Sequence, residues 1–313
     1  MHIAILKSSN DPSNALHRLQ STPLHHGLEQ LGVRTTQVML DGAVGSIAPP
    51  THIVVHYFDK KALAVAVDVR NQVRAKIVVL CSDIYDLATI RKFASQADLL
   101  LVPTRLHRDL MQSAVMTPVR VLPEAVDPIA LPGEGPVLPP AIDNNICWFG
   151  YPESFAKSMR YLLPDALKAS GFPAKRLCVL TAPGAELLSG LRHKSFTPES
   201  FYAETAEYSH ALLSHFVHDH HINTFIKSPN KLVTSLVRGM VPLASATPSY
   251  LEIARSYHLE KLLFTGPADL ARQLKTLDAE RDRQAYGLAA IGQDLQKTFS
   301  PEATARRFLE LVS

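Results

Sequence analysis

The sequence predicts an α/β protein of two Rossmann-like domains, whose parallel sheets face each other across a cleft. Short apolar runs, typical of buried strands, alternate with amphipathic stretches of helical length. With 313 residues, the chain is long enough for two domains that each bury a core. A segment rich in proline and glycine, 128–145, interrupts the alternation and is typical of an interdomain linker. We therefore expect an N-terminal domain at 1–135 and a C-terminal domain at 136–313.

The first half of the chain carries the pattern of one parallel sheet. Apolar residues at three- and four-residue spacing predict helices at 15–31, 61–73 and 105–114. Strands that alternate with helices favour a parallel, doubly wound arrangement. Six strands are predicted in this half, at 2–6, 33–39, 52–57, 76–81, 99–103 and 119–122.

The second half repeats the pattern after the linker. Long amphipathic helices are expected from about 267 to 312. Two such domains joined by a hinge leave a cleft between the carboxyl ends of their sheets, where ligands bind in folds of this kind. The strands predicted in this half are 146–149, 176–180, 210–216, 241–244 and 261–264.

The composition excludes several classes of protein. An apolar fraction of 46% is that of a globular chain and excludes a disordered one. A formal net charge of only +3 argues against a protein that coats nucleic acid, which needs clustered Lys and Arg. Cys81, Cys147 and Cys178 are too far apart for a disulfide framework or a CxxC metal site, so we expect reduced, partly buried thiols.

The hydropathy pattern favours a cytoplasmic protein. The first residues enter a strand pattern at once and do not resemble a secretory signal. No window approaches the ~20 apolar residues needed to span a bilayer. We therefore expect a cytoplasmic location, with room for peripheral contact at the inner face of the membrane.

Common phosphate-binding motifs are missing from the sequence. The first predicted strand runs into Lys7 and a polar loop without a GxGxxG, and glycines are needed there for a dinucleotide pyrophosphate to approach the backbone. A GxxxxGK[ST] motif and an Asp-x-Asp triplet at a strand end are also missing. The sequence therefore predicts neither a cofactor nor a metal site.

The most informative stretch is 227–245, KSPNKLVTSLVRGMVPLAS. It predicts a polar loop, a short helix that ends at Gly239, and the strand at 241–244. Ser228, Asn230 and Lys231 would lie at the N-terminus of this helix, where unpaired backbone N–H groups favour an anion. Lys227 and Lys231 would supply the charge to neutralise a diphosphate. The alternative is an ordinary capped helix with solvated lysines.

Together with residues 248–253, this stretch resembles the donor-site segment of GT-B glycosyltransferases, especially the retaining, family-four-like group. That group reads roughly K-x-x-K-x-x-E-x-x-x-x-G-x-P-V-V-A. The acidic residue that holds the nucleotide ribose in the family falls on Thr234 here, and the earlier acidic residue falls on Ile226. A threonine cannot accept two hydrogen bonds from a ribose diol as a carboxylate does. Further segments agree with the family in order and spacing, at 97–104, 119–127, 146–150 and 300–311.

The resemblance implies that residues 136–313 bind a nucleoside-diphosphate sugar and residues 1–135 bind the acceptor. Charge develops on the leaving phosphate, so a lysine and a helix N-terminus can stabilise it without a metal. Gly150 would let the backbone approach the donor, and Thr181 would contact the base or ribose. Glu153 and Ser154 are donor candidates whose alternative role is to cap the following helix. The expected diphosphate or ribose ligands of the loop and helix are Lys227, Ser228, Asn230, Lys231, Thr234 and Ser235.

Activation of the acceptor is expected from strand ends of the first domain. Asp83 follows the strand at 76–81 and is a candidate catalytic or acceptor-binding carboxylate, with an N-cap as the alternative. His56 ends the preceding strand and is the second candidate, although a strand histidine is more often a packed core residue. If the enzyme retains configuration, the leaving phosphate can serve as the base.

A cluster of histidines invites a metal-binding interpretation. Its spacing matches neither HExxH nor another zinc motif, and the preferred roles are contact with the donor sugar or a surface loop. The cluster consists of His210, His215, His218, Asp219, His220 and His221.

The sequence thus predicts a metal-independent GT-B-like glycosyltransferase. It would move a sugar from a nucleoside diphosphate to a glycan, a lipid-linked glycan or another cell-envelope acceptor. Two alternatives stay open. One is a nucleotide-sugar epimerase with the same architecture. The other is a binding-only partner or sensor, which Thr234 and Ile226 would mark as having lost turnover.

Overall fold

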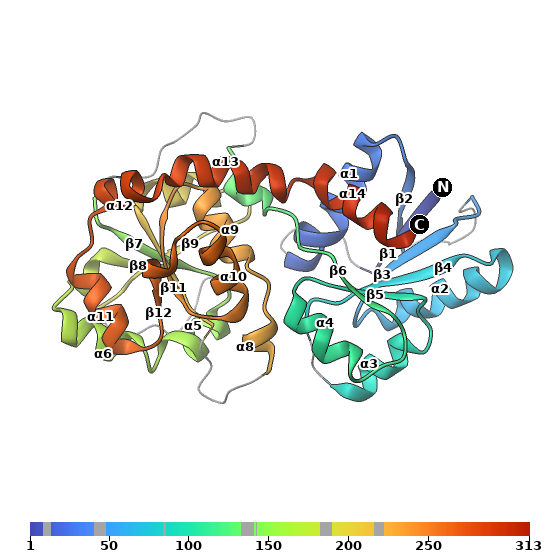
Figure 1. Cartoon of the computed structure of the whole chain (residues 1–313), viewed down its shortest axis with the longest axis horizontal. Helices are drawn as coiled ribbons and strands as arrows, with labels where there is room; N and C mark the ends of the chain where they lie inside the picture. Colours follow the sequence, from blue (N-terminus) through green and yellow to red (C-terminus); the bar gives the residue numbers. More distant parts are fainter. Residues whose placement is uncertain are drawn as a thin grey trace. The chain divides into compact units, whose positions relative to one another are not determined.

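A computed structural model describes the chain as two compact α/β units (Figure 1). Unit 1 comprises Met1–Val126, Ile226–Ser228 and Lys297–Ser313, and unit 2 comprises Asp127–Phe225 and Pro229–Gln296. The two predicted parallel sheets are confirmed, one in each unit. The division into an acceptor domain at 1–135 and a donor domain at 136–313 stays a prediction. The structure describes residues 1–8, 14–40, 48–83, 86–132, 141, 143–181, 190–215 and 222–313.

Unit 1 is built on a six-stranded parallel sheet in the order β2-β1-β3-β4-β5-β6. Its central strands are continuous apolar runs, because helices cover both faces of a parallel sheet. In register, Ile53 of β3 pairs with Ile77 of β4, and both side chains are fully buried. The strands are β1 (His2–Lys7), β2 (Arg34–Met39), β3 (His52–His56), β4 (Lys76–Leu80), β5 (Leu99–Val102) and β6 (Val119–Val121).

Helices of unit 1 form two layers. α2 (Lys60–Val73), α3 (Leu87–Ala94) and α4 (Arg105–Gln112) share one apolar core with the sheet. α1 (Thr22–Gln30), which follows a π-helical turn η1 (His17–Ser21), shares a second core with α14 (Pro301–Val312). The last helix of the chain therefore packs on the first sheet together with α1. The N-caps of α2, α3 and α4 are Asp59, Asp86 and Thr104, each of which accepts a backbone hydrogen bond from its own helix.

Gly27 marks the close approach of α1 to α14, and it gives a test of this packing. A Cβ atom at Gly27 would lie 2.0 Å from the backbone oxygen of Pro301 and 2.9 Å from the Cβ of Ala305. Because the contact is with backbone, Gly27→Ala is expected to lower the free energy of unfolding by about 1–3 kcal/mol. Urea denaturation measures this loss. Gly266→Ala is the control, since no atom lies within 4 Å of its added Cβ, and an equal loss in both variants would contradict the prediction.

Unit 2 contains a second six-stranded parallel sheet, in the order β12-β11-β10-β7-β8-β9. Five of its strands match predicted ones. The sixth, β9, has the sequence RHKS and lies at the sheet edge, so it has no apolar run to signal it. The strands are β7 (Ile146–Phe149), β8 (Leu177–Thr181), β9 (Arg192–Ser195), β10 (His210–Leu213), β11 (Val241–Ser245) and β12 (Leu263–Phe264).

Short helices surround this sheet, and α5, α6 and α11 share an apolar core with it. The predicted helical region 267–312 consists of four separate helices rather than a few long ones. The α-helices are α5 (Pro152–Met159), α6 (Leu163–Ser170), α7 (Phe201–Glu204), α8 (Ile222–Ile226), α9 (Asn230–Val237), α10 (Pro248–Ser256), α11 (Pro267–Lys275), α12 (Ala279–Tyr286) and α13 (Leu288–Thr298). The described residues of unit 2 also include the 3₁₀ turns η2 (Pro128–Ala130), η3 (Ala174–Arg176), η4 (Thr205–Glu207) and η5 (Glu260–Leu262).

Each sheet has a point at which its strand order reverses. In unit 2 this point lies between β7 and β10, and in unit 1 between β1 and β3. Open α/β sheets bind ligands outside the carboxyl ends of the strands at such a point. The residues that follow β7, β10, β1 and β3 are therefore the first places to look for a site.

Two further sequence expectations concern thiols and membrane spans. Cys81, Cys147 and Cys178 are free, as predicted, and all three are buried rather than partly buried. Within the part of the chain that the structure describes, we find no helix long and apolar enough to cross a membrane.

Candidate functional site

The candidate site of unit 2 is described from Lys231, in the first turn of α9. Its ammonium group donates to the backbone oxygen of Phe149, at 2.9 Å, and lies 4.7 Å from the centre of the Trp148 ring. Both partners belong to the end of β7, beside the reversal of strand order. Lys231 thus places a positive charge at the carboxyl edge of the sheet. Its contact with the Trp148 ring is a favourable cation–π interaction.

Gly150 follows β7 and makes room for this lysine. Its φ of +148° is a backbone conformation that L side chains rarely adopt. A Cβ atom at Gly150 would lie 2.5 Å from the ammonium nitrogen of Lys231 and 3.0 Å from the Trp148 ring. The predicted pair of Gly150 and Lys231 is therefore brought together, and glycine is required here both by conformation and by space.

The Thr234 and Ser235 hydroxyl groups of α9 form hydrogen bonds within the helix. Thr234 donates to the side-chain oxygen of Asn230, at 3.2 Å, and is 1% exposed. Ser235 is fully buried and donates to the backbone oxygen of Lys231, at 2.8 Å. Such bonds to the preceding turn are common for Ser and Thr in helices. Thr234 and Ser235 thus hold the first turn together, and their role as ligands stays a prediction.

Further polar groups follow the neighbouring strands of unit 2. Thr181, the last residue of β8, is fully buried, and no described residue is a hydrogen-bond partner for its hydroxyl. The Tyr250 hydroxyl and the His215 ring are 2.7 Å apart, and the His215 backbone N–H donates to Ser245 at the end of β11. Sequence reasoning gave no role to Trp148 or Tyr250. The sequence gives little indication of such a role, because an aromatic residue next to an apolar run is expected to belong to the hydrophobic core.

Glu153 and Ser154 lie in the first turn of α5, and both are exposed. The helix begins after Tyr151, which makes no side-chain capping bond. The interpretation of Glu153 and Ser154 as caps is therefore wrong. Both residues follow Gly150 in the chain, and their contact with a donor stays a prediction.

Lys227 and Ser228 group with unit 1 rather than with α9. The helix starts only at Asn230, and residues 226–228 pack against strand ends of the first sheet. Lys227 forms an ion pair with Asp83, and Thr104 donates to the backbone oxygen of Ile226, at 3.2 Å. Because Asp86 is the N-cap of α3, the capping interpretation of Asp83 is wrong.

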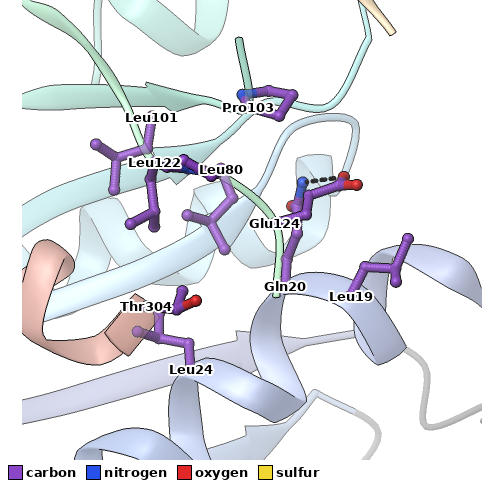
Figure 2. A pocket seen from close by; sticks show the side chains of 10 residues that line it. Leu19, Gln20, Leu24, Leu80, Leu101, Pro103, Leu122, Glu124 and Thr304 are labelled. Atoms are coloured by element: carbon purple, nitrogen blue, oxygen red, sulfur yellow. Dashed lines mark hydrogen bonds between the residues drawn. The ribbon is translucent and has the colours of Figure 1, made fainter. Parts of the chain in front are cut away.

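Glu124 lies at the end of β6, close to the same loop. Its carboxylate accepts a hydrogen bond from Gln20, at 3.1 Å (Figure 2), and another from the Ser228 hydroxyl. Burial raises the pKa of Glu124, and the nearby charge of Asp83 adds to this effect. Sequence reasoning assigned no role to this residue.

His56 is a buried, neutral imidazole at the end of β3. Its ring meets that of His17 edge to face, with the ring centres 5.3 Å apart, and its nitrogens have no hydrogen-bond partner among the described residues. Burial lowers the pKa of His56 to about 3. His107, in the first turn of α4, was not predicted. It is fully buried near Asp83 and Lys227, and burial lowers its pKa to about 4.

The predicted histidine cluster is only partly described. His218, Asp219, His220 and His221 lie outside the described residues. His210 is buried beside the Ser209 hydroxyl, and burial lowers its pKa to about 3. No group of three or more His, Cys, Asp or Glu side chains with metal-binding geometry occurs within the described ranges.

Comparisons with known proteins identify the fold. No protein-family model and no curated sequence matches the chain. Anabaena Alr3699/HepE, solved in complex with UDP and glucose, aligns over 99% of this chain and 98% of its own, with 14% identity and a TM-score of 0.65. The lipopolysaccharide outer core galactosyltransferase WaaB aligns over 100% and 99%, with 12% identity and a TM-score of 0.58. The two parallel-sheet units are therefore those of the two-domain GT-B fold.

Proposed function

We propose that the protein is a glycosyltransferase that uses a UDP-sugar as donor. The observation that carries this proposal is the position of Lys231, held against Phe149 and Gly150 where the strand order of the second sheet reverses. A cation in the first turn of a helix, beside a glycine that exposes backbone, suits a diphosphate. Structures of HepE with UDP and with UDP-glucose support the choice of UDP.

The chemistry asked of unit 2 is the departure of UDP from the anomeric carbon of the sugar. Negative charge develops on the phosphate oxygen as the bond to carbon breaks. We propose that Lys231 and the backbone N–H groups at the start of α9 face that charge and stabilise the transition state more than the ground state. Because they supply positive charge, we propose that the transfer is independent of a metal ion.

Unit 1 is proposed to bind the acceptor, with Asp83 at the carboxyl end of β4 and the ends of neighbouring strands around it. The similarity to WaaB supports a glycan, lipid-linked or other cell-envelope acceptor. His56 is enclosed, so direct contact with the acceptor is not part of this proposal. Lys227 is proposed to fix Asp83 through their ion pair.

Binding of UDP tests the donor site directly. A ligand that binds only the folded state stabilises it by about 2.7 kcal/mol at 100 times its Kd. UDP and UDP-glucose are therefore expected to raise the melting temperature, with the same shift in EDTA. Differential scanning fluorimetry with UDP, GDP, ADP and free glucose measures this. An absence of response to every nucleotide would contradict the donor site, and a loss of the shift in EDTA would contradict metal independence.

A second candidate function is nucleotide-sugar binding without turnover. The observation that favours it is Thr234, which stands at the family's acidic position and uses its hydroxyl within the helix. A sensor of this kind would give the same thermal shift. Prolonged incubation with UDP-sugars separates the two candidates, because the transferase releases UDP slowly to water and the sensor does not.

A further inference from the structure

The N-terminus of α10 in unit 2 has no side-chain cap. Thr247 is the N-cap residue, but its side chain forms no capping hydrogen bond. Thr104 at the start of α4 shows that a threonine of this chain can cap, since its side chain accepts a backbone bond from that helix. The first bond inside α10 runs from the Leu251 N–H to the Thr247 oxygen. The N–H groups of Ser249 and Tyr250 precede this bond, so they have no acceptor within the helix.

Two buried hydroxyl groups accompany these N–H groups. The Thr247 and Ser249 side chains are each 4% exposed. Neither hydroxyl has a hydrogen-bond partner among the described residues. Burying a hydroxyl without a partner destabilises the folded protein, so such groups are rare. The start of α10 therefore gathers two hydroxyl and two N–H donors that lack an acceptor within the part of the chain that the structure describes.

This group of donors lies on the same edge of the second sheet as Lys231. α10 follows β11, whose last residue, Ser245, accepts a hydrogen bond from the His215 backbone N–H, at 3.1 Å. The His215 ring in turn lies 2.7 Å from the Tyr250 hydroxyl of α10. His215 follows β10, which lies between β7 and β11. Because neighbouring strands are ~4.8 Å apart, the ends of β7 and β11 are separated by about 10 Å, a distance that a sugar and its diphosphate can span.

We propose that the N-terminus of α10 binds a carboxylate on the sugar of the donor, so that the preferred donor is a UDP-linked uronic acid. This inference rests on the proposed function and names its sugar. A carboxylate only accepts hydrogen bonds and has about four lone-pair sites, which matches two hydroxyl and two N–H donors. The positive end of the helix dipole favours its negative charge. The hydroxymethyl group of a neutral hexose has one oxygen and a proton of its own, so it would leave some of these donors without a partner.

Titration calorimetry with UDP-glucuronate, UDP-glucose and UDP tests the inference. The wild-type chain is expected to bind UDP-glucuronate about 10- to 100-fold more tightly than UDP-glucose, because hydrogen bonds to a charged group are the stronger ones. The double variant Thr247→Val/Ser249→Ala removes both hydroxyls with little change of volume. It is expected to lose most of this preference and to keep its affinity for UDP. Ser256→Ala removes an exposed hydroxyl at the other end of α10, and as the matched control it keeps the preference.

Thermal unfolding without ligand separates a binding role from a structural one. The Thr247 and Ser249 hydroxyls have no partners among the described residues, so the double variant is expected to melt at the wild-type temperature or above it. Hydroxyls that support the fold would give the opposite result. A melting temperature below that of both the wild type and Ser256→Ala would therefore overturn the inference.

The binding data distinguish the remaining outcomes. Equal affinity of the wild type for UDP-glucuronate and UDP-glucose, or an undiminished preference in the double variant, overturns the inference and leaves the proposed function standing. Inorganic phosphate that binds the wild type but not the double variant, in a chain without the preference, would indicate a site for free phosphate and overturn it as well. A wild-type chain that binds none of the UDP compounds overturns the proposed function, and this inference with it.

Discussion

Lys231→Ala is expected to lower the turnover of a UDP-sugar by about 100- to 1,000-fold and to abolish the thermal shift with UDP. The magnitude is that of removing one oriented charge or donor from a developing oxyanion. The ammonium group is already oriented by Phe149 and Trp148, so little reorganisation is needed when the diphosphate arrives. Steady-state kinetics of UDP release, together with titration calorimetry of UDP, measures both effects.

Two variants define the specificity of this result. Lys157→Ala removes an exposed lysine of α5 in the same unit, and it is expected to behave as the wild type. Gly150→Ala keeps the charge but forces a Cβ atom against the Lys231 ammonium, so UDP affinity is expected to fall without loss of the lysine. If Lys231→Ala binds UDP as tightly as Lys157→Ala, the donor site does not lie at the end of β7.

The sheets could be predicted because their strands are buried on both faces. β3, β4 and β7 are continuous apolar runs bounded by polar residues, and this signal depends only on local sequence. β9 could not be found in this way, since an edge strand with the sequence RHKS buries little. The docking of α14 on unit 1 was also beyond local sequence. Its apolar face shows that it packs, but not on which sheet.

Candidate residues could be named where a local pattern signals them, and their roles in binding stay predictions. Lys231 and Gly150 were found from the loop-helix-strand pattern and from the glycine after a strand. Lys227 was assigned to the same diphosphate because it lies in the polar loop that leads into the helix and carries a positive charge. Pro229 precedes the first helical residue, so Lys227 stays outside the helix and reaches Asp83 instead.

Other members of the unit 1 cluster depend on contacts between distant parts of the chain. Gln20 and Glu124 are 104 residues apart, and Lys227 and Asp83 are 144 apart. His107 carries no pattern that separates it from a surface histidine of α4, because its burial depends on the packing of neighbouring strands. Such a cluster is visible only once the fold brings the strand ends together.

The buried histidines predict that unit 1 is labile to acid. His56 and His107 have folded pKa values of about 3 and about 4, below the ~6.5 of an exposed histidine. At a pH between the folded and the unfolded pKa of a histidine, the unfolded chain binds more protons than the folded chain. The contribution of each neutral histidine to the free energy of unfolding is therefore full above pH 6.5 and is lost as the pH falls. At pH 5 each histidine is expected to lower the free energy of unfolding by about 2 kcal/mol. The free energy of unfolding of unit 1 therefore falls by about 4 kcal/mol relative to neutral pH.

This loss is large, because a domain is stable by only about 5–15 kcal/mol. Hydrogen exchange of the β3 and β4 amides at pH 7, 6 and 5, corrected for intrinsic rates, reports on unit 1. Fluorescence of Trp148, the single tryptophan of the chain, reports on unit 2 during urea unfolding. The double variant His56→Phe/His107→Phe is expected to flatten the pH dependence of unit 1, whereas His26→Gln, at an exposed histidine, leaves it unchanged. Equal protection of β3 and β4 at pH 7 and pH 5 would mean that both rings gain partners for their protons, and that their enclosure does not keep them neutral.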